Sequence, residues 1–291
     1  VQGFAPSGAF FQYAMVRLLG PDIVWKIAAV YLDDIIVVGK SAAECAANVA
    51  TIMARLASVK FRINFSKCEF VPSTCIDFLG CRLEGQLVHP GPKVATMLSK
   101  IRPPHEQHTP KAQRHHLHVF LGMCAFIMQH APGLKQTLAP LYLSVASEPF
   151  RYGDAEKAAF SKAMVILQHL NPYFLPSSEP DVIVEVMPDA SGGRVDPEDP
   201  GAWSAVLGQR KGAINLEAIH EGFELLQCDG GVFNRRQAMW DVLKKEAWAL
   251  FQGLLRFRPF VYGRRVRVIV DSKVLMFMFR AESPVIKRWH A

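Results

Sequence analysis

Two adjacent carboxylates, Asp33 and Asp34, interrupt an apolar stretch that runs from Ile23 to Val38. Val, Ile and Tyr dominate the residues on either side, which favours strands over a helix. Two acidic residues between two such runs indicate a β-hairpin with the carboxylates at its tip. The same charges, together with Lys26, keep this stretch from being a membrane helix, which needs about 18 apolar residues in a row.

A pair of carboxylates on an apolar hairpin is costly unless a cation neutralises it. Mg²⁺ is the natural partner, because it prefers carboxylate oxygens together with phosphate oxygens. Two such ions, about 4 Å apart, can clamp the attacking and leaving oxygens of a phosphoryl transfer. The alternative is a solvated turn that happens to carry two aspartates.

The 291 residues are half apolar and one fifth charged, which is typical of a folded chain with one large domain or two to three small ones. Before residue 181 the pattern predicts a helix over 41–58, capped by Ser41 and Glu44, short strands over 61–90, and helices over 92–101, 110–130 and 155–170. From residue 181 it predicts strands over 181–187, 202–209 and 216–226, a helix over 234–255, a strand over 266–270 and a short helix.

The distribution of charged residues, cysteines and histidines indicates the type of partner and the cellular environment. Residues 1–146 hold 14 Lys and Arg against 8 Asp and Glu, and an arginine-rich run lies between Arg256 and Arg267, so a nucleic-acid partner fits. Six cysteines without a C-x-x-C pair indicate reduced thiols in an intracellular chain. Six of the ten histidines lie between 105 and 130, where a zinc site competes with a pH-sensitive helix surface.

The first half resembles the reverse transcriptases of retroviruses and gypsy-type LTR retrotransposons. Tyr31-Leu32-Asp33-Asp34 resembles their Y-x-D-D signature. The upstream segment Gln2 to Gln12 is similar to their P-Q-G-W-x-x-S-P-A-x-F-Q and P-F-G-L-x-x-A-P-x-x-F-Q segments. Further segments resemble, in order, the family's "K-C-x-F", "F-L-G", "D-P-x-K-V", "F-L-G" and "A-P-L" runs: Lys67 to Phe70, Phe78 to Gly80, His89 to Val94, Phe120 to Gly122 and Ala139 to Leu141.

The second half is similar to the RNase H of the same polyproteins. The segments that carry this resemblance are Asp189-Ala190-Ser191, Ala202 to Gln209, Lys245 to Leu250, Phe257 to Gly263 and Val270 to Lys273. Asp189 and Asp271 each follow a predicted strand, and Glu246 lies beside the apolar stripe of the predicted helix between them. If those strands are neighbours, the three carboxylates meet at one end of a sheet and can hold two metal ions.

The resemblance implies an α+β fold: the C-terminal part of a reverse-transcriptase palm (1–90), a thumb and connection (91–149) and an RNase H-like mixed-sheet α/β domain (150–291). It implies RNA-directed DNA synthesis and hydrolysis of RNA in RNA·DNA hybrids by two-metal phosphoryl transfer. A non-catalytic, nucleic-acid-binding remnant of a retrotransposon and a structural domain of a larger assembly are the alternatives. The family's third polymerase Asp is expected upstream of Val1, so we expect no primer extension by this chain alone.

The expected site residues follow from these segments. The catalytic and metal-binding residues are expected to be Asp33, Asp34, Asp189, Glu246 and Asp271, and the substrate-binding residues Gln2, Gly3, Tyr31 and Lys67. The expected cofactor is Mg²⁺, with Mn²⁺ as a substitute. The expected partners are an RNA template, a DNA primer, RNA·DNA hybrid, dNTPs and the rest of the Pol polyprotein, with no membrane. The expected location is inside the cell, in the cytoplasm, the nucleus or a virus-like particle.

Overall fold

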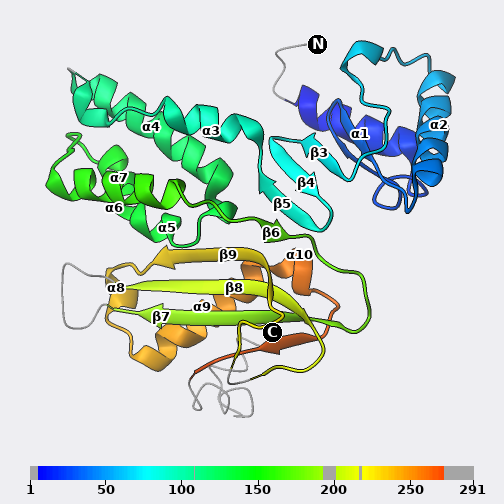
Figure 1. The fold of residues 1–291 in the computed structure, drawn as a ribbon. Coiled ribbons are helices and arrows are strands. Elements are labelled where there is room, and N and C mark those ends of the chain that lie inside the picture. Colours follow the sequence, from blue (N-terminus) through cyan, green and yellow to red (C-terminus); the bar gives the residue numbers. More distant parts are fainter. Residues whose placement is uncertain (1–5, 108, 193–200, 216–217, 272–291) are drawn as a thin grey trace. The chain divides into compact units, whose positions relative to one another are not determined.

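The computed structural model describes residues 6–107, 109–192, 201–215 and 218–271, which form two compact units, 1–85 and 86–291. The first unit begins with helix α1 (Ser7–Leu19) and the hairpin strands β1 (Ala28–Tyr31) and β2 (Asp34–Val37). Helix α2 (Ala42–Ser58), the short helix η1 (Phe65–Lys67) and the antiparallel pair β3 (Cys75–Phe78) and β4 (Cys81–Glu84) follow (Figure 1). The helix predicted over 41–58 is present, and the Ser41 hydroxyl accepts from the Glu44 amide.

The core of the first unit lies between its two long helices and the hairpin. Met15 and Leu19 of α1 are buried against Ile52 and Leu56 of α2 and Val30 of β1. Each helix therefore presents one apolar stripe, at three- and four-residue steps, to the same interior. This packing leaves the tip of the hairpin at the surface.

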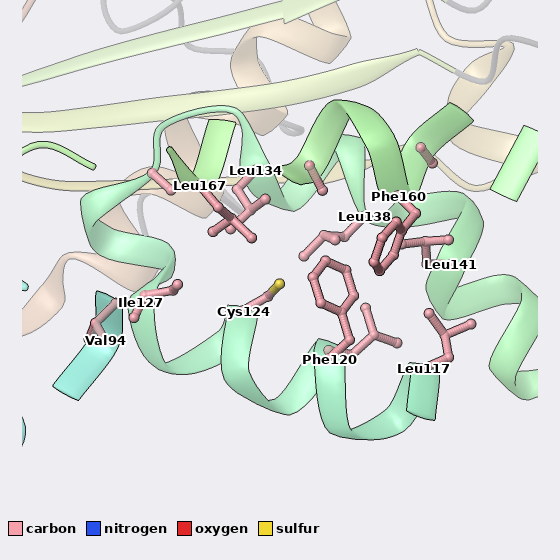
Figure 2. Close-up of a cluster of buried hydrophobic side chains, with 14 residues drawn as sticks. Val94, Leu117, Phe120, Cys124, Ile127, Leu134, Leu138, Leu141, Phe160 and Leu167 are labelled. Carbon is pink, nitrogen blue, oxygen red and sulfur yellow. The ribbon is translucent and has the colours of Figure 1, made fainter. Parts of the chain in front are cut away.

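The second unit opens with a helical layer. Its elements are β5 (Leu87–Pro90), α3 (Pro92–Ser99), η2 (Pro104–Glu106), α4 (Pro110–Ile127), η3 (Met128–His130), α5 (Leu134–Thr137), α6 (Ala139–Ala146), α7 (Asp154–Leu167) and β6 (Tyr173–Phe174), which pairs with β5. Figure 2 shows how α4 and α7 share one apolar core, in which the rings of Phe120 and Phe160 lie 4.6 Å apart. Helix α7 lies beyond the expected domain boundary at residue 150 but packs into this helical layer; the boundaries themselves stay predictions.

A four-stranded mixed sheet follows, in the order β10-β7-β8-β9. Strands β7 (Val182–Ser191), β8 (Ala202–Lys211) and β9 (Glu224–Val232) are antiparallel neighbours, whereas β10 (Val266–Val268) runs parallel to β7. Helices α8 (Arg235–Ala238), α9 (Val242–Arg256) and α10 (Arg258–Val261) lie between β9 and β10 in the sequence, and α9 covers one face of the sheet (Figure 1).

Three local predictions were wrong in detail. The strand expected over 216–226 is instead β9, at 224–232, and turns occupy the described residues 218–222. The helix expected over 234–255 divides into α8 and α9, because the Asp241 side chain caps a new helix at the Lys244 amide. The strand expected to reach Val270 ends at Val268. None of the helices among the described residues is both long and apolar enough to cross a membrane.

Candidate functional site

The Asp33-Asp34 hairpin has the predicted form. Strands β1 and β2 pair in antiparallel register, with Tyr31 opposite Asp34, so the connecting loop consists of Leu32 and Asp33 alone. Both aspartates are exposed, and the side chain of Tyr31 is 56% exposed beside them. The hairpin therefore presents two carboxylates and one aromatic ring to solvent from the same turn.

Gln12, on α1, holds this turn in place. Its side-chain Nε2 donates to the carbonyl of Val30 at 2.9 Å, and its Oε1 accepts from the amide of Leu32 at 2.6 Å. Leu32 has a φ of 53°, a left-handed conformation that a branched side chain adopts at a cost. The glutamine thus holds the β1 side of the strained turn, by contacts on either side of Tyr31. Sequence reasoning did not assign it a role, although it ends the segment similar to F-Q.

The other expected substrate-binding residues are Lys67, Gln2 and Gly3. Lys67 ends η1 and is exposed, while Asn64 caps that helix by accepting from the Ser66 amide at 3.2 Å. Gln2 and Gly3 lie outside the described residues.

The mixed sheet brings together the two strands that precede or carry two of the expected carboxylates. Asp189 lies near the end of β7, exposed and opposite Ser204 of β8. Strand β10 pairs with β7 so that Val268 lies beside Val186, and the amide of Ile269 donates to the Val186 carbonyl at 3.0 Å. Asp271 and Asp189 are each three residues beyond that pair. If this register continued beyond the end of β10 at Val268, Asp271 would lie level with Asp189, about 5 Å away between backbones.

Glu246 comes from the helix that covers this sheet. Helix α9 lies close to the sheet at Gly253, where an added Cβ would lie 2.7 Å from the Ala205 Cβ and 3.7 Å from Val186 Cγ1. At the other end of the helix, the Lys245 ammonium donates to the Gly192 carbonyl at 2.7 Å. The helix therefore runs antiparallel to β7.

The level of Glu246 along the strand follows from helix geometry. Glu246 precedes Gly253 by two turns, or about 10 Å, which matches the rise of three strand residues from Val186 to Asp189. Side chains alternate along a strand, however, and Val186 faces α9, so Asp189 lies on the opposite face of the sheet. Glu246 is thus level with Asp189 but belongs to a helix on the other face.

The carboxylates expected in this site are of the chemical type that binds a divalent cation, but the described residues do not form a complete set of ligands. Carboxylate oxygens from Asp189 and Asp271 are the hard donors that Mg²⁺ prefers. Within the described ranges, no group of three or more His, Cys, Asp or Glu side chains is positioned to hold a metal ion. The same observation gives no support to the zinc alternative for the described histidines between 105 and 130.

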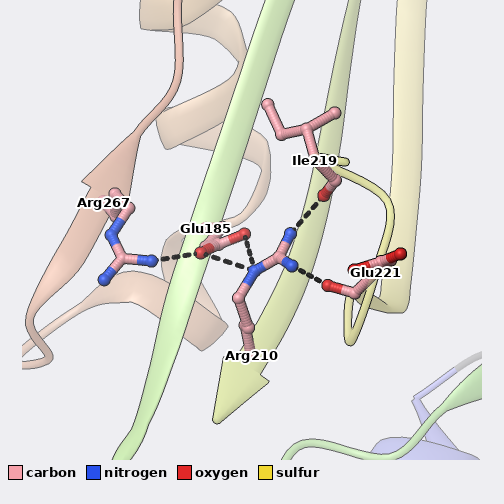
Figure 3. A network of polar contacts seen from close by, with 5 residues as sticks. All are labelled: Glu185, Arg210, Ile219, Glu221 and Arg267. Carbon is pink, nitrogen blue, oxygen red and sulfur yellow. Dashed lines mark hydrogen bonds and ion pairs between the residues drawn. The ribbon is translucent and has the colours of Figure 1, made fainter. Parts of the chain in front are cut away.

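Most of the arginine-rich run near the C-terminal end of the sheet is used for internal contacts. Arg267 pairs with Glu185 of β7, Arg256 with Asp229 of β9, and Arg264 donates to the Ser177 carbonyl. The buried pair of Glu185 and Arg210 was not anticipated from the sequence. Figure 3 shows Glu185 between Arg210 and Arg267, with Arg210 also donating to two backbone carbonyls of the connection before β9.

One thiol of the sheet has a perturbed ionisation. Burial, with the neighbouring charge of Asp229 as a smaller contribution, raises the pKa of Cys228 in β9 to about 11. The thiol therefore stays protonated at neutral pH, the form that is a poor nucleophile.

Comparison with protein families places these features in a known context. A family model described as reverse transcriptase (RNA-dependent DNA polymerase) matches residues 1–83, which include the hairpin and Lys67. A second, described as the RNase H-like domain found in reverse transcriptase, matches residues 198–291. That range includes Glu246 and Asp271 and begins after Asp189.

Related proteins cover almost the whole chain. The retrovirus-related Pol polyprotein from transposon 297 of Drosophila melanogaster is 24% identical over 99% of the chain and 25% of its own length. A putative enzymatic polyprotein of Cassava vein mosaic virus is 25% identical over 97% of the chain and 40% of its own length. The chain therefore spans less than half of either relative.

Solved structures show the same fold. The foamy viral protease-reverse transcriptase in complex with RNA/DNA hybrid matches 99% of this chain, over 37% of its own length, with a TM-score of 0.74 and 16% identity. The same enzyme in complex with dsDNA matches with a TM-score of 0.72 and 16% identity. The expected combination of palm, helical and RNase H-like parts is confirmed at the level of the fold.

Proposed function

Because this chain belongs to the reverse transcriptase and RNase H region of retroelement Pol polyproteins, we propose that it contributes to two phosphoryl-transfer reactions. The first unit would take part in RNA-directed DNA synthesis on an RNA template and a DNA primer, with dNTPs as substrates. The sheet of the second unit would take part in hydrolysis of RNA in RNA·DNA hybrids. We place both reactions inside the cell, within the larger Pol polyprotein.

The observation that carries the proposal is the pairing of β10 with β7, which supports a shared site for Asp189 and Asp271. In that site the two carboxylates would hold Mg²⁺, without Glu246, whose helix covers the other face of the sheet. The bound metal would supply charge neutralisation and a water of lowered pKa. On the first unit, Asp33 and Asp34 would have the same role, with Gln12 keeping their loop in position and Tyr31 contacting the nucleic acid.

The test is hydrolysis of labelled RNA in an RNA·DNA hybrid by the purified chain, with Mg²⁺ or Mn²⁺. We expect cleavage that falls to the buffer background in Asp189→Asn and in Asp271→Asn. The matched control is Asp181→Asn, just before β7, because Asp181 forms only an exposed ion pair with Lys211 and should be neutral. Full cleavage by both site variants would overturn the assignment.

Hybrid binding without cleavage by the wild-type chain would favour the second candidate, a nucleic-acid-binding remnant. One observation favours this candidate: the described residues contain no cluster of three possible metal ligands. Its binding should weaken steeply with salt, because phosphate contacts release counterions.

A further inference from the structure

An ion pair between Glu185 of β7 and Arg267 of β10 joins the two strands that lead to the proposed metal site. Glu185 is fully buried in the middle of β7, and its carboxylate accepts from Arg210 Nε at 3.2 Å and from Arg267 at 2.6 Å (Figure 3). Arg210 is itself only 2% exposed, so the pair it forms with Glu185 belongs to the interior. Arg267 is the one member of this network that comes from β10.

Arg210 and Arg267 connect different segments of the chain to Glu185. Arg210 also donates to the carbonyls of Ile219 and Glu221, so it joins β8 to the connection before β9. Among the described residues Arg267 pairs with Glu185 alone, which lies directly beside it in the β10–β7 register. Loss of Arg267 would therefore leave the Glu185 carboxylate still neutralised by Arg210. Strand β10 would, however, lose its only ion pair with β7 among the described contacts.

The register of strand β10 against β7 depends on such an ion pair. It is three residues long and lies at the edge of the described sheet, so few backbone hydrogen bonds fix its register. A slip by one residue would turn Asp271 to the other face, and a slip by two would move it about 7 Å along β7. Either displacement exceeds what a site for two ions about 4 Å apart can tolerate.

The spacing connects the ion pair to the proposed site. Asp189 lies four residues after Glu185, and Asp271 lies four residues after Arg267. An even spacing along β7 puts Glu185 and Asp189 on one face of the sheet, about 13 Å apart, and Asp271 would lie on the same face if the strand conformation of β10 continued beyond Val268. We propose that Glu185 and Arg267 form a register clamp, with both acting as positioning residues that keep Asp271 level with Asp189. This inference rests on the proposed function of that carboxylate pair.

The test uses Mn²⁺ binding to the full chain, followed through the electron paramagnetic resonance signal of free Mn²⁺. We expect Arg267→Ala to weaken binding by about 10-fold or more, as removal of supporting partners around metal sites commonly does. Arg267→Lys keeps the charge and should restore most of the affinity. Arg265→Ala is the matched control, since it removes the same charge from an exposed position two residues earlier and should bind as wild type.

A second readout follows the register itself. The amide of Ile269, which donates to Val186, should exchange with deuterium faster in Arg267→Ala than in wild type, while amides inside β8 should not change. Wild-type Mn²⁺ affinity and unchanged Ile269 exchange in Arg267→Ala would overturn the clamp. If wild type binds no Mn²⁺, or Asp189→Asn binds it equally well, the proposed function fails; the Ile269 exchange then decides the clamp alone.

Discussion

Replacing Gly253 with alanine should destabilise the second unit, although alanine is the better helix former. Gly253 lies within α9, where the helix meets the sheet. A Cβ there would lie 2.7 Å from the Ala205 Cβ, a distance that carbon atoms in contact do not adopt. The Ala205 methyl group cannot rotate away, because it sits on the backbone of β8. Either the helix or the strand must move.

The two opposing effects can be compared. Alanine in place of glycine inside a helix gains about 1 kcal/mol from lower backbone entropy in the unfolded chain and better propensity. Overpacking of a well-packed core costs about 1–3 kcal/mol. We expect the clash to dominate and Gly253→Ala to lower the free energy of unfolding by up to about 2 kcal/mol.

The assay is urea denaturation followed by circular dichroism, with a matched glycine as control. Gly122 lies within α4, and an added Cβ there meets nothing within 4 Å. Gly122→Ala should therefore gain about 0.5–1 kcal/mol, opposite in sign to Gly253→Ala. If Gly253→Ala matches or exceeds the wild-type stability, the close approach of α9 to the sheet is not as described.

Three further outcomes are expected. Gln12→Ala should destabilise the first unit by about 2 kcal/mol, because two hydrogen bonds that hold the strained turn are lost; an unchanged urea midpoint would contradict this. Burial lowers the pKa of His130, whose Nδ1 lies 2.9 Å from the Asn171 carbonyl, so its contribution to stability is present above pH 6.5 and is lost as the pH falls from there towards the lowered value. His130→Gln should flatten the fall of Tm between pH 7.5 and 5, and an unaltered slope would refute this. Exposed Cys68 should react with iodoacetamide at pH 7.5, whereas half-buried Cys228, with its pKa raised to about 11, should react much more slowly until the protein unfolds; equal labelling rates for both would contradict this.

The local pattern of the sequence was sufficient for elements with strong signals. The hairpin was predicted from β-branched runs around two acids, and α2 was predicted from its Ser41 and Glu44 cap. These elements follow from contacts within a few residues of one another. The confirmed family resemblance supplied the overall fold, which local periodicity alone could not.

The missed features depend on contacts between distant residues. Strand β9 begins at Glu224 because it pairs with β8, and the alternating apolar pattern over 216–226 did not reveal that register. Gln12 acts on a turn about 20 residues away, and Glu185 is neutralised by arginines 25 and 82 residues away. A charged residue inside an apolar strand was the available signal, since a buried carboxylate requires such partners.

The central claim is that Asp189 and Asp271 share a divalent cation, and a crystal structure of the chain grown with Mn²⁺ tests it most directly. The account predicts an anomalous density peak with carboxylate oxygens of both residues at coordination distance, about 2 Å. Carboxylates more than about 10 Å apart, or Mn²⁺ bound elsewhere with none between them, would contradict it.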